Sequence, residues 1–141
     1  MAKEKFYRVR IEDAPTVPLP MGRGTVFKLV DPDIGAVNAD IHVNVIAPGA
    51  GRGEIHFHRK AENTYIVLEG QLEVCIEGGV RHVLGAGEAG HIPPGVVHTA
   101  TNARQDSACR IIEIYAPAGP DFHEVEGWPD GIEPPMPNEE K

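Results

Sequence analysis

The chain has 141 residues, 41% of them hydrophobic and 24% charged, which is ordinary for one soluble globular domain and too short for two full ones. Its formal net charge is −8 and it has no run of Lys or Arg, which argues against nucleic acid or an anionic membrane surface as the partner. No apolar stretch approaches the roughly 20 residues that a membrane helix needs, which argues against a membrane span. The expected partner is a small-molecule substrate.

Two further features bear on where the protein works. The first residues, MAKEKFYR, lack the apolar region of a secretory signal. Cys75 and Cys109 each lie inside an apolar run and have no C-x-x-C spacing, which is typical of buried thiols in a reducing compartment. We therefore expect a cytoplasmic protein.

The N-terminal part of the chain, residues 1–35, is predicted to contain strands and a connector. Residues 6–11 alternate between apolar or aromatic side chains and arginine, which favours a strand. A Pro-rich connector follows over residues 13–24, and a second short strand is expected over residues 25–30.

The middle of the chain, residues 36–118, is predicted to form an all-β barrel core. Glycine (16 residues) and proline (13 residues) are plentiful in the chain and separate short apolar runs. No segment here keeps a helical period over three turns. Closely spaced short strands are typical of a sandwich, jelly roll or barrel, which limits exposed sheet edges. The predicted strands are 40–47, 54–58, 64–68, 71–77, 80–84, 91–92, 96–101 and 109–116.

The C-terminal part, residues 119–141, is predicted to be a Pro-rich acidic tail. Six prolines and several acids lie between Pro117 and Lys141, and this composition cannot build a core of its own. The tail therefore either lies over the barrel or stays mobile, and it can act as a lid, as a dimer contact or as an inert extension.

The most specific chemical feature is the sequence His56-Phe57-His58. On a strand, alternation puts the two imidazoles on one face and Phe57 on the other. Two converging neutral imidazoles are the beginning of a site for a first-row transition metal, but the site needs a third ligand from a distant strand. His98 is the candidate for that ligand.

Two segments of the chain resemble the motifs of a known family. Residues 87–102 match the second cupin motif, G-x5-P-x-G-x2-H-x3-N, at every fixed position, and this motif contains His98. Residues 51–70 resemble the first cupin motif, with H-x-H followed by an acidic stretch and YIVLEG. The chain is therefore similar to small single-domain cupins, of the type called cupin 2 conserved barrel proteins.

The resemblance implies a fold and a cofactor. The fold is a double-stranded β-helix, the cupin jelly-roll barrel, in which the two motifs face each other. His56, His58 and His98 would bind one divalent transition metal ion, namely Fe, Ni, Zn, Cu or Mn. Small cupins often pair through a sheet edge, so the resemblance also implies a homodimer.

One position departs from the family pattern. Cupins usually place a glutamate ligand five residues after the second histidine, and here that position is Asn63, while Glu62 lies one residue earlier. One step along a strand reverses the direction of the side chain, so Asn63 is expected to occupy the fourth ligand position. The alternative is a local bulge that turns Glu62 inward. A neutral Asn63 would favour Zn, Ni, Cu or Fe over Mg or Ca.

Two other residues are candidates for a substrate pocket. His42 shares a strand face with Asn44, and that face either lines a pocket or meets solvent. Tyr65 shares a face with Asn63 and is either a pocket wall or part of the core.

The sequence is compatible with three functions. The first is a metal-dependent, dioxygenase-like enzyme acting on a small oxygen-rich molecule; residues 115–122 resemble the closing run of many such cupins. The second is a non-oxidative isomerase, lyase or decarboxylase in which the metal is a Lewis acid and Glu62 or a nearby histidine moves the proton. The third is a non-catalytic module that binds a ligand or metal, including a barrel that has lost its ion.

Overall fold

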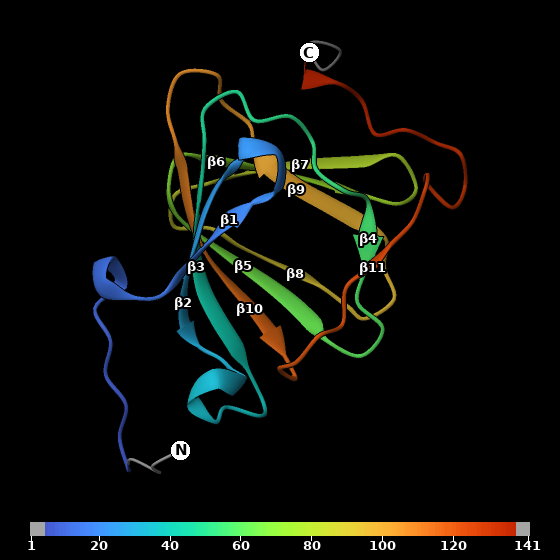
Figure 1. Cartoon of the computed structure of the whole chain (residues 1–141). Helices are drawn as coiled ribbons and strands as arrows, with labels where there is room; N and C mark the ends of the chain where they lie inside the picture. Colours follow the sequence, from blue (N-terminus) through green and yellow to red (C-terminus); the bar gives the residue numbers. More distant parts are fainter. Residues whose placement is uncertain (1–4, 138–141) are drawn as a thin grey trace.

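The molecule consists mainly of two antiparallel β-sheets, which confirms the all-β prediction (Figure 1). The structure is a computed structural model and describes residues 5–137; the ends of the predicted N-terminal part and of the predicted tail, residues 1–4 and 138–141, lie outside them. The first sheet has the strand order β1 (Thr16–Leu19), β2 (Gly24–Val30), β3 (Asp40–Ile46), β10 (Cys109–Ala116), β5 (Glu62–Glu69) and β8 (Ala89–Ile92). The second has the order β11 (His123–Glu124), β4 (His56–Phe57), β9 (His98–Asn102), β6 (Gln71–Ile76) and β7 (Val80–Gly85).

The two sheets face each other across one hydrophobic core, which confirms the predicted jelly-roll architecture. Both sheets contribute to a single cluster of buried side chains, so the inner faces pack together. The core comprises Ile46, Tyr65, Val67, Leu72, Val74, Ile92, Cys109 and Ile111.

Strand β5 shows how alternation directs side chains into this barrel. Asn63, Tyr65 and Val67 are buried on its inner face, whereas Glu62 between the turn and Asn63 is exposed. The pairing of β5 with β10 is regular around this end of the strand, with Tyr115 opposite Asn63. Asn63 and Tyr65 therefore face the barrel interior together.

The predicted strand over residues 6–11 is wrong. Residues 7–10 have no regular structure and Ile11–Asp13 form a short 3₁₀ turn, η1. Phe6 is 78% exposed, because this segment has no neighbouring strand to complete its backbone hydrogen bonds. The first strand is instead Thr16–Leu19, inside the predicted connector, and it lies at a sheet edge, where Pro18 is tolerated.

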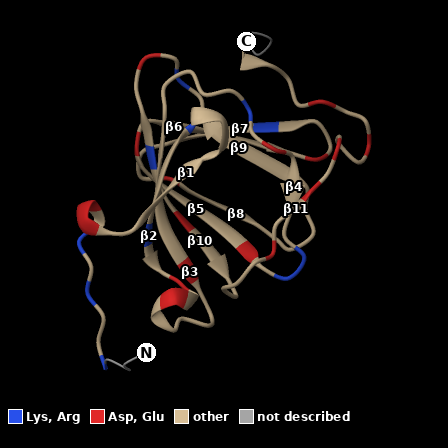
Figure 2. Cartoon of the chain, in the orientation of Figure 1, with Lys and Arg blue, Asp and Glu red and all other residues tan. Residues whose placement is uncertain are grey.

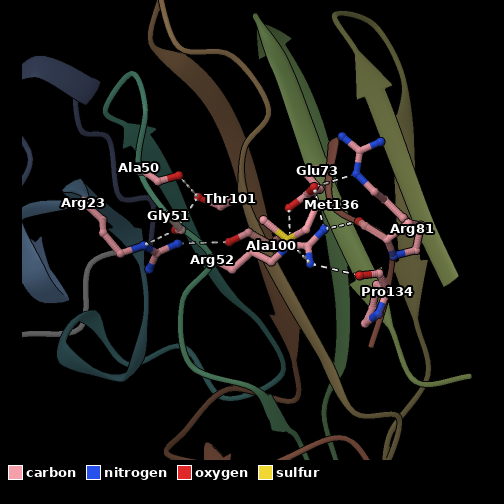
Figure 3. Close-up of polar contacts among 11 residues, drawn as sticks. Arg23, Ala50, Gly51, Arg52, Glu73, Arg81, Ala100, Thr101, Pro134 and Met136 are labelled. Carbon is pink, nitrogen blue, oxygen red and sulfur yellow. Dashed lines mark hydrogen bonds and ion pairs between the residues drawn. The ribbon is translucent and has the colours of Figure 1, made fainter. Parts of the chain in front are cut away.

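The described part of the tail lies along the barrel and is held there by an arginine (Figure 3). Arg52 donates hydrogen bonds to the carbonyl oxygens of Pro134 (3.2 Å) and Pro135 (2.6 Å). The same guanidinium contacts both carboxylate oxygens of Glu73, at 2.9 and 3.0 Å, and Glu73 also accepts from Arg81 at 2.6 Å. The tail is thereby joined to β6 and β7.

Charged groups are spread over the described chain. Figure 2 shows that Lys and Arg positions are distributed over several segments and that acidic positions lie on the turns η1 and η3 (Pro32–Ile34). A third 3₁₀ turn, η2, spans Pro20–Gly22. Within residues 5–137 no helix has the length and apolar character that crossing a membrane requires.

Candidate metal centre

Three imidazoles converge on one point between the two sheets. His56 lies on β4, His58 follows the end of β4, and His98 begins β9. One ring nitrogen from each residue lies within 4.8 Å of those of the other two. His98 and His58 are buried and His56 is partly so. This separation leaves room for a shared ion with metal–nitrogen bonds of about 2.1 Å.

The second nitrogen of each ring is held by the backbone. In every case Nδ1 lies within hydrogen-bond distance of a carbonyl oxygen, which can only accept, so Nδ1 carries the proton and Nε2 keeps a free lone pair. Such outer hydrogen bonds orient metal-binding histidines. The three contacts are His56 Nδ1 to Glu54 O (2.8 Å), His58 Nδ1 to Asp121 O (2.7 Å) and His98 Nδ1 to Val96 O (2.9 Å).

Burial disfavours the charged form of two of the rings, those of His98 and His56. It lowers the pKa of His98 to about 4, with a further contribution from the neighbouring His56, and it lowers the pKa of His56. A neutral imidazole is the form that binds a metal.

The donor atoms fit a metal ion. His58 Nε2 is buried and has no hydrogen-bond partner among the described residues. Buried polar atoms are nearly always paired, so this orphaned lone pair needs an explanation. A cation at the point where the three rings meet provides one.

Asn63 completes the donor set. Its side chain is fully buried, and its Oδ1 lies 3.2 Å from His98 Nε2. Its Nδ2 donates to Glu113 Oε2 at 3.1 Å and to the carbonyl of Ile114 at 3.3 Å, so the oxygen end of the amide faces the imidazoles. Oδ1 of Asn63 and the unprotonated Nε2 of His98 are both hydrogen-bond acceptors, so their lone pairs repel each other at this distance. A cation bound by both atoms would remove this repulsion.

Glu62, predicted as a catalytic residue, is not brought to this point. Its side chain is 59% exposed and its carboxylate lies 3.3 Å from His91 Nε2, on the outer face of the sheet. No register shift occurs at Glu62 or Asn63, so the alternation of β5 sends Glu62 outward.

Glu113 is a buried carboxylate that sequence reasoning missed. It lies on the inner face of β10, where it accepts hydrogen bonds from Asn44 Nδ2 (2.8 Å) and His42 Nε2 (3.1 Å) through Oε1. Burial alone would raise its pKa, but the hydrogen bond and charge of His42, with the amides of Asn63 and Asn44, lower the pKa to about 2. Glu113 is therefore ionised next to the candidate metal centre.

His42, predicted to line a substrate pocket, belongs to this network and is not among the residues that line the two cavities described below. Its Nδ1 lies 3.0 Å from Asp40 Oδ1, so carboxylates flank both ring nitrogens. Burial lowers the pKa of His42, but the hydrogen bonds and charges of Asp40 and Glu113 outweigh it and raise the pKa to about 9. His42 is a buried imidazolium behind Glu113.

An open cavity of about 290 Å³ lies beside the imidazoles. His56, Asn44, Tyr65 and Glu113 are among the residues that line it, so Tyr65 is both part of the core and a cavity wall. Apolar residues such as Leu19, Ile46 and Ile111 form much of the remaining wall. The cavity combines an apolar body with a few polar groups, as small-molecule sites usually do.

A second cavity of about 340 Å³ reaches His58. Tyr115 and Phe122 line both cavities. The ring of Phe122 stacks on His56, with centroids 4.2 Å apart and an interplanar angle of 21°. Phe122 is half exposed, so the tail supplies an aromatic cover over one of the three imidazoles.

The tail also supports β4, the strand that carries His56. Strand β11 pairs with β4, with Glu124 opposite His56 (Figure 1). The Asp121 carboxylate accepts hydrogen bonds from the backbone N–H groups of Arg59 (2.8 Å), Lys60 (2.8 Å) and Ala61 (2.9 Å). Asp121 thus fixes the turn that follows His58.

Comparison with known proteins agrees with this geometry. The family model described as Cupin domain matches residues 42–115, a span that contains all three imidazoles. An oxalate decarboxylase of Arthroderma benhamiae is 30% identical over 115 residues, which are 77% of this chain and 27% of that protein. The chain therefore spans about a quarter of the length of this curated relative.

Solved structures share the fold. The polyketide cyclase RemF from Streptomyces resistomycificus superimposes with a TM-score of 0.74 and 25% identity, covering 89% of each chain. The oxalate decarboxylase of Lactobacillus farciminis, in its formate complex, has a TM-score of 0.66 and 21% identity over 81% of this chain and 34% of that one.

Proposed function

The chain belongs to the cupin family, and on that premise we propose that it is a metal-dependent enzyme that acts without oxidation on a small oxygen-rich molecule. The observation that carries the proposal is the convergence of three imidazoles, two buried and one partly buried, with one ring nitrogen of each within 4.8 Å of the others and with the orphaned Nε2 of His58 in this cluster. The Asn63 oxygen lies at the same point.

The donor set favours Lewis-acid chemistry. Three neutral imidazoles and one neutral amide bring no negative charge, so a divalent ion bound by them would keep its full positive charge. Nitrogen donors also favour Zn, Ni, Cu or Fe over Mg or Ca. An ion bound here would act as a Lewis acid and would polarise a carbonyl or enolate oxygen of the substrate.

The chain's own residues hold and shield the substrate. The apolar walls of the 290 Å³ cavity bury its carbon skeleton, and Tyr65 supplies an aromatic surface beside the imidazoles. Phe122, which stacks on His56 and lines the same cavity, limits the access of water to the imidazoles. Restricting water strengthens the electrostatic interactions within the site.

The relatives support an oxygen-rich substrate. An oxalate decarboxylase is a curated relative, and a polyketide cyclase is a structural neighbour at 25% identity. The names of both describe reactions on carbonyl or carboxyl compounds. We therefore propose a small keto or carboxylic acid as the substrate class.

The test uses protein stripped with a chelator and then loaded with Zn²⁺, Ni²⁺, Fe²⁺ or Mn²⁺. Each form is incubated with oxalate and with a poly-β-keto acid, under argon and in air, and products are followed by mass spectrometry with an oxygen electrode. We expect metal-dependent turnover under argon that is lost in His98→Ala. Turnover that consumes O₂ would contradict the non-oxidative proposal and favour the dioxygenase-like alternative.

A further inference from the structure

The orientation of the Asn63 amide depends on its neighbours. An amide has an acceptor end and a donor end of almost the same shape, so only the hydrogen-bond partners decide which end faces the imidazoles. The Nδ2 end meets the Glu113 carboxylate at 3.1 Å and the carbonyl of Ile114 at 3.3 Å, and both groups only accept. The Oδ1 end is left at the metal centre.

We propose that Glu113 is the positioning residue that makes Asn63 an oxygen donor to the metal. Glu113 lies behind Asn63, and from there it supplies the negative charge that a carboxylate ligand would otherwise bring to the ion. This inference rests on the proposed metal-dependent function. It concerns Asn63 and Glu113 only, so it can fail while the metal centre stands.

The network around Glu113 requires a carboxylate. Oε1 accepts from His42 and Asn44, and Oε2 accepts from Asn63, so donors meet both oxygens. A glutamine at this position has a single acceptor atom. If its NH₂ group faces Asn63, the Asn63 amide loses this acceptor, and if the NH₂ group faces His42 and Asn44, both of those donors lose theirs.

The same geometry explains why position 63 holds an amide. A carboxylate there would place two buried carboxylate oxygens about 3 Å apart, since Nδ2 of Asn63 lies 3.1 Å from Glu113 Oε2, and like charges at that distance cannot both remain ionised. The amide at Asn63 and the carboxylate at Glu113 therefore form a matched pair. Exchanging both groups would keep the net charge, the hydrogen bond between positions 63 and 113 and the acceptor for His42 and Asn44, and it would remove only the longer 3.3 Å bond to the carbonyl of Ile114.

That exchange is the test. Co²⁺ binding is measured for the stripped full chain and for the variants Glu113→Gln and Asn63→Asp/Glu113→Gln, through dissociation constants from competition with a chelating dye and through the visible Co²⁺ spectrum. Melting temperatures are recorded alongside. Glu62→Gln, an exposed neighbour of Asn63, is the matched control and should equal the wild type.

We expect Glu113→Gln to weaken Co²⁺ binding about 10- to 100-fold and to change the spectrum, since misdirecting an orienting group typically costs this much. The double variant should recover both the affinity and the spectrum, because the new NH₂ group of position 113 donates to the new carboxylate of position 63. A purely structural Glu113 would lower the melting temperature and leave the Co²⁺ spectrum unchanged.

Two results overturn the inference while leaving the metal centre intact. One is a Glu113→Gln protein with the wild-type dissociation constant and spectrum, and the other is a double variant as weak as Glu113→Gln. If Glu113→Gln does not fold, Asn63→Asp/Glu113→Gln is compared with Asn63→Ala/Glu113→Gln, and equal affinities overturn it. A wild-type chain that binds no Co²⁺ overturns the proposed function as well.

Discussion

His56 and His98 are register partners in the antiparallel pair formed by β4 and β9, and their ring centroids lie 4.4 Å apart. Residues directly opposite in an antiparallel pair have neighbouring side chains on the same face. The distance between these two imidazoles is therefore set by the strand pairing and not by a flexible loop. A metal bound here needs little rearrangement of the chain.

Replacing His58 by Ala should remove most of the bound metal. Its Nε2 is one of three converging donors, and losing one imidazole leaves two rings and an amide. We expect elemental analysis to show well below one ion per chain, with a smaller effect on the melting temperature of the stripped protein, because both sheets remain. The exposed His82→Ala is the control, and undiminished metal in His58→Ala would remove this residue from the site.

The two neighbours on β5 should behave in opposite ways. Asn63→Ala should weaken metal binding because the buried amide oxygen lies 3.2 Å from His98 Nε2. Glu62→Gln should leave binding unchanged because its carboxylate lies on the outer face, next to His91. Isothermal titration with Zn²⁺ measures both, and weaker binding in Glu62→Gln alone would reverse the assignment.

Asp121→Ala should lower both stability and metal affinity. The carboxylate is only 15% exposed and accepts three backbone hydrogen bonds, so its loss should cost about 2 to 3 kcal/mol of unfolding free energy. The turn that it fixes follows His58, so Zn²⁺ binding should weaken too. Urea denaturation and Zn²⁺ titration measure the two effects. The exposed tail residue Glu126 is the control, and an Asp121→Ala protein as stable as Glu126→Ala would contradict this role.

The buried imidazolium of His42 should make stability depend on pH. Asp40 and Glu113 raise its pKa to about 9 against burial, and Tyr115 packs beside the ring. A raised pKa means that the folded chain binds the proton more tightly than the unfolded chain. The contribution of protonated His42 to the unfolding free energy is therefore complete below the ordinary histidine pKa of about 6.5, and it is lost as the pH rises through the folded-state pKa of about 9.

Urea denaturation of the stripped protein at pH 6, about 7.5 and 9 measures this effect. The wild type should lose more stability across this range than His42→Gln, which has no proton to release. If the unfolding free energy depended on pH in the same way in both proteins, His42 would not be charged in the folded chain.

Much of the architecture was accessible from the sequence because its signals are local. Turn residues and short apolar runs predicted the barrel strands, and alternation placed His56 and His58 on one face of a strand. The spacing of the second motif supplied His98. The same alternation predicted that Asn63, not Glu62, would face inward, and the structure places both side chains accordingly.

Other features depend on contacts between distant segments. Glu113 is one acid in an apolar strand, and its role follows only from the pairing that sets it opposite His42 on β3 and Tyr65 on β5. The inward face of His42 has the same origin. The alternating run from Phe6 has the pattern of a strand but has no neighbour to pair with, so pattern alone misled the prediction.

The most direct measurement is a crystal structure of the metal-loaded protein with anomalous scattering data at the absorption edge of the bound ion. We expect one anomalous peak about 2.1 Å from the Nε2 atoms of His56, His58 and His98, with the Asn63 oxygen as the next donor. A peak held by other residues, or a fully loaded protein with no peak between these three rings, would contradict this metal centre.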